Sequence, residues 1–330
     1  MAACLALAGV SFGESVVAEE AKFSTDTTPY IERAVVQEFI RDVAVRHELN
    51  QNTLAGWFKS LKPQRNILEA ISTPAERTLT WKEYRPIFLG DERINSGREF
   101  LNTHRTTLDR AEAEYGVPAT IIAAIIGVET FYGKHKGKHG ALESLATLAF
   151  DYPRRSEFFT QELEAFILLS SEEGWDPLAR KGSYAAAMGF PQFIASSYRA
   201  YAVDFDGDGK RDLINSIEDS IGSVGNYLAV HGWTTGAPVA DRWKTTEANA
   251  AAVAKLERKS LKPRIAAQTV RNLGFDAIGK EPVSVMPLRG KNGTQTWVGY
   301  KNFYVITRYN HSRLYAMAVM QLAQQLEVDG

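Results

Sequence analysis

The sequence predicts a mainly α-helical fold of the α+β class, in which a small β subdomain follows a long helical part. Three observations support this prediction. Apolar residues recur at helical spacing over 29–105, and the segment 106–235 keeps that spacing between glycine-rich and aspartate-rich loops. Short runs of β-branched and aromatic residues, separated by turn residues, appear only after Pro238. We therefore expect an N-terminal helical lobe, a helical core and a small sheet near the C-terminus.

Residues 1–28 are predicted to be a clipped secretory signal or lipoprotein segment with a linker. An apolar run from Met1 to Val10 precedes small residues that end at Ala18, which resembles a secretory h-region and its cleavage site, although the basic start is missing. Ala2-Ala3-Cys4 also resembles the end of a lipoprotein box, except that Met1 stands where leucine is usual. We therefore expect an exported protein of the periplasm or cell envelope. Peripheral association with the outer membrane, or lipid anchoring through Cys4, stays open.

The later divisions follow the same patterns. Within 29–105 the helical spacing is formed by Ile31, Val35, Phe39, Ile40, Val43, Trp57, Phe58 and Leu61. The segment 236–311 is predicted to be the small β subdomain, with strands at 283–288, 295–300 and 303–306. Residues 312–330 return to helical spacing, and we expect a C-terminal helix that packs back on the helical lobe.

The composition excludes several kinds of partner and site. The 38 basic and 39 acidic residues give a net charge of -1, so no overall field favours nucleic acid. Cys4 is the only cysteine, which excludes a disulfide or a cysteine zinc site within one chain. Any metal should therefore be bound by oxygen. No stretch beyond the N-terminal run approaches the roughly 20 apolar residues that span a bilayer. We expect the protein to be a monomer.

Glu129 is the strongest catalytic candidate. Pro118 fits the first turn of a helix and Gly133 fits its end, so Glu129 lies in the last turn. Residues one turn back, such as Ile125, are apolar. Burial and the negative end of the helix dipole both disfavour the anion, which leaves a protonated acid near neutral pH. Such an acid can protonate a glycosidic oxygen, and the neighbouring Tyr132 ring can stack on a sugar. The alternative is a helix-end glutamate that reaches solvent.

A second polar cluster lies in a segment dense in small residues, 182–197. Its main polar groups are Ser183 and Gln192. Gln192 can donate and accept hydrogen bonds at once, which suits an N-acetyl group or a sugar hydroxyl. The alternative is that the small residues serve helix packing.

The aspartate loop Asp204-Phe-Asp206-Gly-Asp208-Gly-Lys210 has the opening pattern of an EF-hand. Three carboxylates and the carbonyl of Lys210 would bind Ca²⁺. The twelfth position is Asn215 instead of glutamate, so Glu218 is the residue expected to close a longer loop. We expect this calcium to be structural, because clustered carboxylates repel one another without a cation. The alternative is a solvated acidic turn.

Three separated segments, 128–133, 182–193 and 306–310, resemble the marker segments of the lytic murein transglycosylase B family, in the family's order. The resemblance extends from about residue 29 to residue 326. It implies a lysozyme-like core in which one glutamate protonates the glycosidic oxygen between N-acetylmuramic acid and N-acetylglucosamine. The same group then acts as base while the muramyl C6 hydroxyl attacks C1, which leaves a 1,6-anhydro product. The partner implied is the glycan strand of peptidoglycan.

By motif position, Glu129 is similar to the family's catalytic glutamate. Ser183 and Gln192 are similar to residues that contact sugar, and Tyr309 and Asn310 to residues that line the same cleft. The resemblance also implies a calcium-binding loop like the one predicted here, extended in length and ending in an acidic residue. Ala186 departs from the glycine expected in many relatives, and its methyl group could narrow the cleft.

Two alternatives to a lytic transglycosylase remain from the residues themselves. Asp151 could be a second carboxylate, and if it faces Glu129 a hydrolytic lysozyme-type muramidase becomes possible. The third hypothesis is a non-catalytic, calcium-dependent glycan-binding protein of the envelope. The basic run from Lys134 to His139 could face acidic stem peptides, although a solvated loop is the interpretation that we favour. Cleavage within strands or from their ends stays open.

Overall fold

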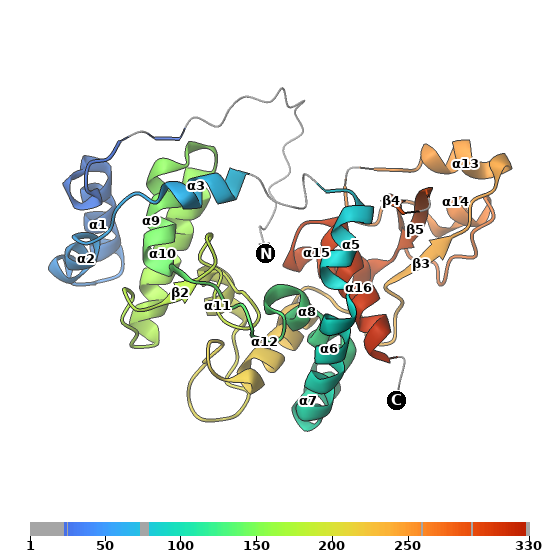
Figure 1. Ribbon diagram of the computed structural model, residues 1–330, viewed down its shortest axis with the longest axis horizontal. Helices are drawn as coiled ribbons and strands as arrows, with labels where there is room; N and C mark the ends of the chain where they lie inside the picture. Colours follow the sequence, from blue (N-terminus) through green and yellow to red (C-terminus); the bar gives the residue numbers. More distant parts are fainter. Residues whose placement is uncertain (1–22, 25, 73–78, 259, 292, 328–330) are drawn as a thin grey trace.

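The computed structural model describes residues 23–24, 26–72, 79–258, 260–291 and 293–327. Its fold is mainly α-helical with two small antiparallel sheets (Figure 1). Residues 1–22 of the predicted signal or lipoprotein segment, Cys4 included, lie outside the described residues. In the described part of the chain, no single helix is long and apolar enough to cross a membrane. The helices Arg105–Tyr115 (α7) and Ala119–Thr130 (α8), which meet at a 113° bend, pass that test together.

The N-terminal elements are η1 (Tyr30–Glu32), α1 (Ala34–Arg46), α2 (Gln51–Phe58) and α3 (Arg65–Ser72). Helix α1 buries Val36, Phe39, Ile40 and Val43, which share one helical face. Asn50 caps α2, because its side chain accepts a hydrogen bond from the Thr53 amide at 3.0 Å. This group lies beside α9 (Ala141–Asp151) at one end of the molecule (Figure 1).

The predicted lobe 29–105 does not form one unit. Helices α5 (Trp81–Phe88) and α6 (Asp91–Thr103) contact the C-terminal helix α16 (Arg313–Glu327), whereas α1 to α3 lie at the other end of the molecule (Figure 1). Helix α16 itself packs most extensively on α8 (Ala119–Thr130), and also on α5 and α6. The segment 29–105 therefore contributes to two separate parts of the fold.

The central helices surround α8, which is buried at every position except Thr120. A helix that is apolar on all sides is stable only inside a core. Its neighbours include α7 (Arg105–Tyr115), α12 (Ile217–Val230) and α16. Helices α10 (Ser156–Glu172) and α11 (Ala195–Tyr201) pack on each other, and η2 (Pro153–Arg155) joins α9 to α10.

The first sheet pairs β1 (His139–Gly140) with β2 (Lys181–Gly182). The second has the order β3-β5-β4, formed by Ala240–Trp243, Gly293–Gly299 and Ser284–Gly290. Val285 pairs with Val298 in this sheet, and both join a separate apolar cluster with Val253 of α13 (Glu247–Ala254) and Val270 of α14 (Ala267–Arg271).

The strands predicted at 283–288 and 295–300 are confirmed, but the strand predicted at 303–306 is wrong. These residues belong to α15 (Lys301–Tyr309). Phe303, Ile306 and Tyr309 are all buried and recur every third residue, which is a helical pattern. A run of four apolar residues is too short for spacing alone to distinguish the two structures.

Candidate active site and metal-binding loop

Glu129 lies in the last turn of α8, and only 5% of it is exposed. The helix ends because Phe131 and Tyr132 adopt left-handed conformations, with φ of 53° and 55°, before Gly133. The Arg93 guanidinium of α6 donates a hydrogen bond to the Gly127 carbonyl at this helix end. This cation offsets the negative end of the helix dipole that the sequence analysis placed beside Glu129.

One polar contact of the Glu129 carboxyl comes from the C-terminal helix. The Tyr315 hydroxyl of α16 donates a hydrogen bond to Glu129 Oε1 at 2.7 Å, across 186 residues of sequence. Both side chains are buried. The Tyr315 ring stacks on Tyr309, with centroids 6.3 Å apart and planes 10° from parallel. Sequence reasoning missed Tyr315. Its only local signal was a phenol on the apolar face of a helix, because a buried tyrosine hydroxyl requires a partner.

Tyr309 and Asn310 lie at the C-terminal end of α15, so the structure brings Tyr309 to the same region as Glu129. The Tyr309 hydroxyl donates to the Pro191 carbonyl at 2.6 Å. Burial raises the pKa of this hydroxyl well above its usual value, and the nearby Glu129 charge raises it further. Asn310 is 5% exposed, and its Nδ2 has no hydrogen-bond partner among the described residues. A buried amide donor of this kind can serve a ligand.

Ser183 and Gln192 lie in the loop between β2 and α11, and both are buried. Ser183 Oγ accepts a hydrogen bond from the Ala187 amide at 3.1 Å. Gln192 Nε2 donates to the Gly189 carbonyl at 2.9 Å and lies 3.2 Å from the Lys136 carbonyl. These bonds hold the loop closed on itself and against the segment that follows α8.

The two loops beside Glu129 are held in strained backbone conformations. In the described ranges five non-glycine residues have positive φ, and four of them are Phe131, Tyr132, Ala186 and Gln192. Such conformations persist only where surrounding structure imposes them, and they cluster at functional sites. The Ala186 methyl group is buried, since the residue is 2% exposed. The expectation that this methyl group narrows the cleft stays a prediction.

Tyr132 lies elsewhere. A side chain added at Gly97 of α6 or Gly127 of α8 would collide with the Tyr132 ring. Gly127 and Glu129 are two residues apart on a helix and face nearly opposite directions. The ring therefore packs behind α8, and the structure does not bring it to the carboxyl of Glu129.

Asp151 does not face Glu129. It is fully buried, and its carboxylate forms an ion pair with Arg33 at 2.7 Å and accepts from the Tyr30 hydroxyl at 2.5 Å. The sequence could not show this, because Tyr30 and Arg33 belong to the N-terminal elements. Asp151 anchors those elements to α9 instead of forming the second carboxylate of a hydrolase.

The basic run after α8 is partly engaged with protein groups. Lys134 Nζ lies 3.4 Å from the Glu92 carboxylate. Lys136 Nζ donates to the Ile214 carbonyl at 2.7 Å. Lys136 therefore ties the segment after α8 to the end of the aspartate loop.

The aspartate loop brings together Asp204, Asp206 and Asp219, with one carboxylate oxygen of each within 4.8 Å of the others. Oxygen donors in this arrangement fit the requirements of Ca²⁺. Asp219 is buried, and its oxygens accept hydrogen bonds from the Phe205 and Asp212 amides at 2.7 Å each. Burial raises the pKa of Asp219, and the charge of Asp206 also raises it.

The structure brings Asp219, and not the predicted Glu218, into the carboxylate cluster. Glu218 and Asp219 are adjacent in the first turn of α12, so their side chains point in different directions. Asp219 faces the loop, whereas the charge of Glu218 acts on His104 of the α6–α7 junction. Asp208 lies in the loop without joining the carboxylate cluster, and its Oδ1 accepts from the Lys210 amide at 2.8 Å. The Lys210 carbonyl as a ligand stays a prediction.

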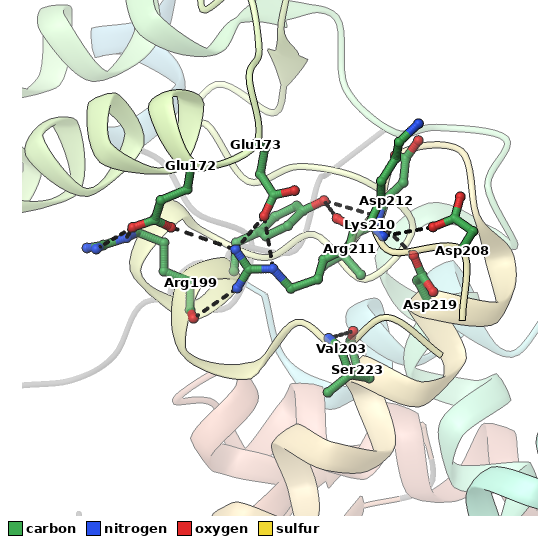
Figure 2. Close-up of polar contacts among 12 residues, drawn as sticks. Glu172, Glu173, Arg199, Val203, Asp208, Lys210, Arg211, Asp212, Asp219 and Ser223 are labelled. Atoms are coloured by element: carbon green, nitrogen blue, oxygen red, sulfur yellow. Dashed lines mark hydrogen bonds and ion pairs between the residues drawn. The ribbon is translucent and has the colours of Figure 1, made fainter. Parts of the chain in front are cut away.

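The loop is fixed on both sides. Arg211 donates to Glu173 and pairs with Glu172 at 3.7 Å, which fastens the loop to the end of α10 (Figure 2). On the other side the Phe190 amide donates to the Leu213 carbonyl at 2.9 Å. Gly189 packs so closely there that a Cβ would lie 2.1 Å from the Leu213 oxygen. The aspartate loop therefore supports the loop that contains Gln192.

Comparison with known proteins gives one consistent family. The model of the transglycosylase SLT domain matches residues 32–324. The membrane-bound lytic murein transglycosylase B of Escherichia coli strain K12 is 40% identical over 308 residues, which cover 87% of this chain and 81% of that protein.

Two solved structures extend this comparison to the fold. The soluble lytic transglycosylase SltB1 from Pseudomonas aeruginosa is 46% identical with a TM-score of 0.83, over 88% of this chain and 97% of that one. The Escherichia coli lytic transglycosylase Slt35 in complex with calcium is 37% identical with a TM-score of 0.81, over 92% and 94% of the two chains. The predicted fold class, mainly helical and lysozyme-like with a small β part, is confirmed.

Proposed function

The chain belongs to the transglycosylase SLT domain family and is a peptidoglycan lytic transglycosylase, and from this premise we propose that Glu129 is its single catalytic acid and base. The observation that carries the proposal is the buried hydrogen bond from Tyr315 to Glu129 Oε1. Because the phenol occupies Oε1, the acid form carries its proton on Oε2. Burial favours that neutral form.

The other buried carboxylates support a mechanism with one carboxylate. In the described part of the chain, the buried acids besides Glu129 are Asp151, Glu162 and Asp219. Asp151 is neutralised by Arg33, and Glu162 accepts from the Ser196 amide and hydroxyl at 3.0 and 2.5 Å. Asp219 accepts backbone amides of the aspartate loop. Hydrolysis by paired carboxylates needs a second acid beside the bond, and each of these three is committed elsewhere.

In the proposed reaction Glu129 donates its proton to the glycosidic oxygen between N-acetylmuramic acid and N-acetylglucosamine. The C1–O bond breaks, and Glu129 becomes a carboxylate that Tyr315 stabilises by its hydrogen bond. The carboxylate then removes the proton of the muramyl C6 hydroxyl while that oxygen bonds to C1. The 1,6-anhydro ring forms, and Glu129 returns to its acid form without the participation of water.

For substrate contacts we propose Asn310, Tyr309, Ser183 and Gln192. Asn310 is supported most directly, because its buried Nδ2 donor has no protein partner among the described residues. Ser183 and Gln192 already form hydrogen bonds within their own loop. We therefore propose that they hold the backbone of that loop in the position where it contacts the sugar. Tyr132 packs behind α8 and is withdrawn from this set.

We propose that Asp204, Asp206 and Asp219 hold a Ca²⁺ ion that stabilises the fold. Support comes from the carboxylate cluster and from a relative whose structure is described as a complex with calcium. The ion would neutralise three mutually repelling carboxylates and thereby stabilise the loop against which Phe190 packs. It takes no part in the proton transfers.

Location and assembly follow from the same premise. A relative that is a membrane-bound lytic murein transglycosylase supports a place in the cell envelope, and we propose export to the periplasm through the segment 1–28. We propose that the protein acts as a monomer. We also propose that it associates with the outer membrane through a lipid on Cys4, which lipid analysis of the purified protein would test.

The deciding experiment is digestion of purified sacculi by wild type and Glu129→Gln. General acid catalysis contributes roughly 100- to 10,000-fold, so release of 1,6-anhydro products should fall by that factor. Glu162→Gln is the matched control, since it changes another buried glutamate and should retain activity. Products one water heavier would indicate a muramidase. Binding of sacculi by both proteins without any cleavage would indicate a glycan-binding protein, and full activity of Glu129→Gln would remove Glu129 from the mechanism.

A further inference from the structure

A cavity of about 460 Å³ lies outside the region of Glu129, between α5, the β4–β5 hairpin and α16. Its volume is within the range of roughly 300–1,000 Å³ that is usual for ligand sites. Helix α16 contributes Tyr315 to Glu129 and Gln321 to this cavity. The two positions are six residues apart, about 9 Å along the helix and on different faces. The cavity is therefore separate from the scissile bond.

The cavity has an apolar floor and a cationic rim. Trp81 and Trp297 form the floor, and both indoles are largely buried. The rim is formed by the cations Lys82, Arg85, Arg242 and Lys291, and all four side chains are exposed. They come from helix α5, strand β3 and the hairpin turn, so the fold gathers them from three separate segments.

No negative charge in the cavity balances this rim. Among the described residues that line it, none is acidic. The nearest acids along the chain, Glu83 and Asp241, do not line the cavity. Glu83 accepts from the Thr80 amide at 2.8 Å and Asp241 from the Tyr300 hydroxyl at 2.9 Å. Like charges gathered without a counter-charge repel one another, so an anionic ligand would be attracted and would relieve that repulsion.

Two carboxamides give the cavity a capacity for peptide recognition. Gln321 Oε1 accepts from Arg85 Nε at 3.1 Å, and Gln295 Oε1 lies 3.3 Å from Trp297 Nε1. Each amide nitrogen remains a donor for a carbonyl or carboxylate. Cations with amide donors above an apolar floor match a short peptide that carries several carboxylates.

We propose that this cavity is a binding site for the anionic stem peptides of peptidoglycan, distinct from the site that cleaves the glycan. The proposal rests on the peptidoglycan lytic activity, because stem peptides are the acidic part of that substrate. Such a site holds the enzyme on peptide-bearing strands, so its loss weakens binding to intact sacculi and leaves the chemistry at Glu129 unchanged.

The first test is direct binding of the free stem tetrapeptide, L-alanyl-γ-D-glutamyl-meso-diaminopimelyl-D-alanine, followed by the indole N–H resonances of Trp81 and Trp297. The wild type should show saturable shifts that salt weakens. The triple variant Lys82→Gln/Arg242→Gln/Lys291→Gln should lose them. The matched control, Lys255→Gln/Lys262→Gln/Lys280→Gln, removes three exposed charges of the same C-terminal region that do not line the cavity, and it should keep them. Absence of shifts in the wild type overturns the proposal.

The second test is sedimentation with sacculi in a Glu129→Gln background, before and after an amidase removes the stem peptides. Three exposed ion pairs together contribute on the order of a tenfold change in affinity. The triple variant should therefore bind intact sacculi about tenfold more weakly and bind stripped glycan as tightly as its parent. An equal loss on stripped glycan, or shifts with anionic lipid vesicles but not with the peptide, overturns the peptide assignment. Because neither test requires cleavage, failure here is distinguishable from failure of Glu129 as the acid.

Discussion

Removal of the Tyr315 hydroxyl tests the hydrogen bond on which the active-site assignment depends. Tyr315→Phe deletes one buried O–H group that donates to Glu129 Oε1 at 2.7 Å and leaves the ring that stacks on Tyr309. A hydrogen bond to a charged group contributes about 1.5–3 kcal/mol, and one between neutral groups about 0.5–1.5 kcal/mol. In the proposed reaction Glu129 is neutral before the first proton transfer and charged after it, so the substitution should affect the charged state more.

The difference between these two values, about 1–1.5 kcal/mol, corresponds to a loss of roughly 5- to 15-fold in kcat/KM. The assay is release of 1,6-anhydro muropeptides from sacculi across a pH series. Because the phenol favours the ionised carboxylate, its removal should also move the alkaline limb of the pH–rate profile to higher pH.

Tyr30→Phe is the matched control for Tyr315→Phe. It deletes another buried phenol that donates to a carboxylate, Asp151, at 2.5 Å, but outside the active site. Both variants should lose stability, and only Tyr315→Phe should lose activity with a shifted profile. Equal activity of the two variants, or an unshifted profile in Tyr315→Phe, would refute the reasoning.

The remaining predictions concern stability. Calcium should raise the melting temperature of the wild type and of Glu218→Gln, but not of Asp219→Asn, as measured by calorimetry with and without a chelator. A rise in the melting temperature of Asp219→Asn with calcium would exclude Asp219 as a ligand. Gly189→Ala should destabilise far more than Gly207→Ala in urea unfolding, because φ is positive at both positions, 73° and 78°, but only Gly189 has a carbonyl in the path of a Cβ; the Gly207 substitution should cost about 1–2 kcal/mol. Burial raises the pKa of Glu162 above its ordinary 4.5, so the folded state binds more protons at this group than the unfolded state does. The stability that results is fully present below pH 4.5 and is lost as the pH rises through the raised pKa. Glu162→Gln should remove this slope from a pH series of unfolding free energies, and an unchanged slope would contradict the assignment.

Local spacing carried much of the information about the active site. The helix from Pro118 to Gly133 could be predicted because proline, an apolar run and glycine fix its start, its surroundings and its end. The aspartates at 204 and 206 could be predicted because alternate positions in one tight loop point at one centre. The structure confirms the helix and brings Asp204 and Asp206 together, because in each case the residues involved lie within a few positions of one another.

Predictions failed where a side chain's direction or a distant segment decided the outcome. Glu218 and Asp219 are adjacent, and only the placement of α12 selects Asp219 for the loop. Tyr132 follows Glu129 closely in sequence, yet the left-handed turn at the end of α8 sends its ring behind the helix. Spacing does not report the turn direction that follows a helix.

The sequence by itself determined the helical class, the small sheet, the position of Glu129 at a helix end and the family, because each depends on patterns within short segments. Only the tertiary structure decided that Tyr315 donates to Glu129, that Asp151 is neutralised by Arg33, and that four cations from three segments surround one cavity. The physical reason is that a buried polar group must find its partner wherever the packed chain places one, and packing joins positions that no periodicity connects.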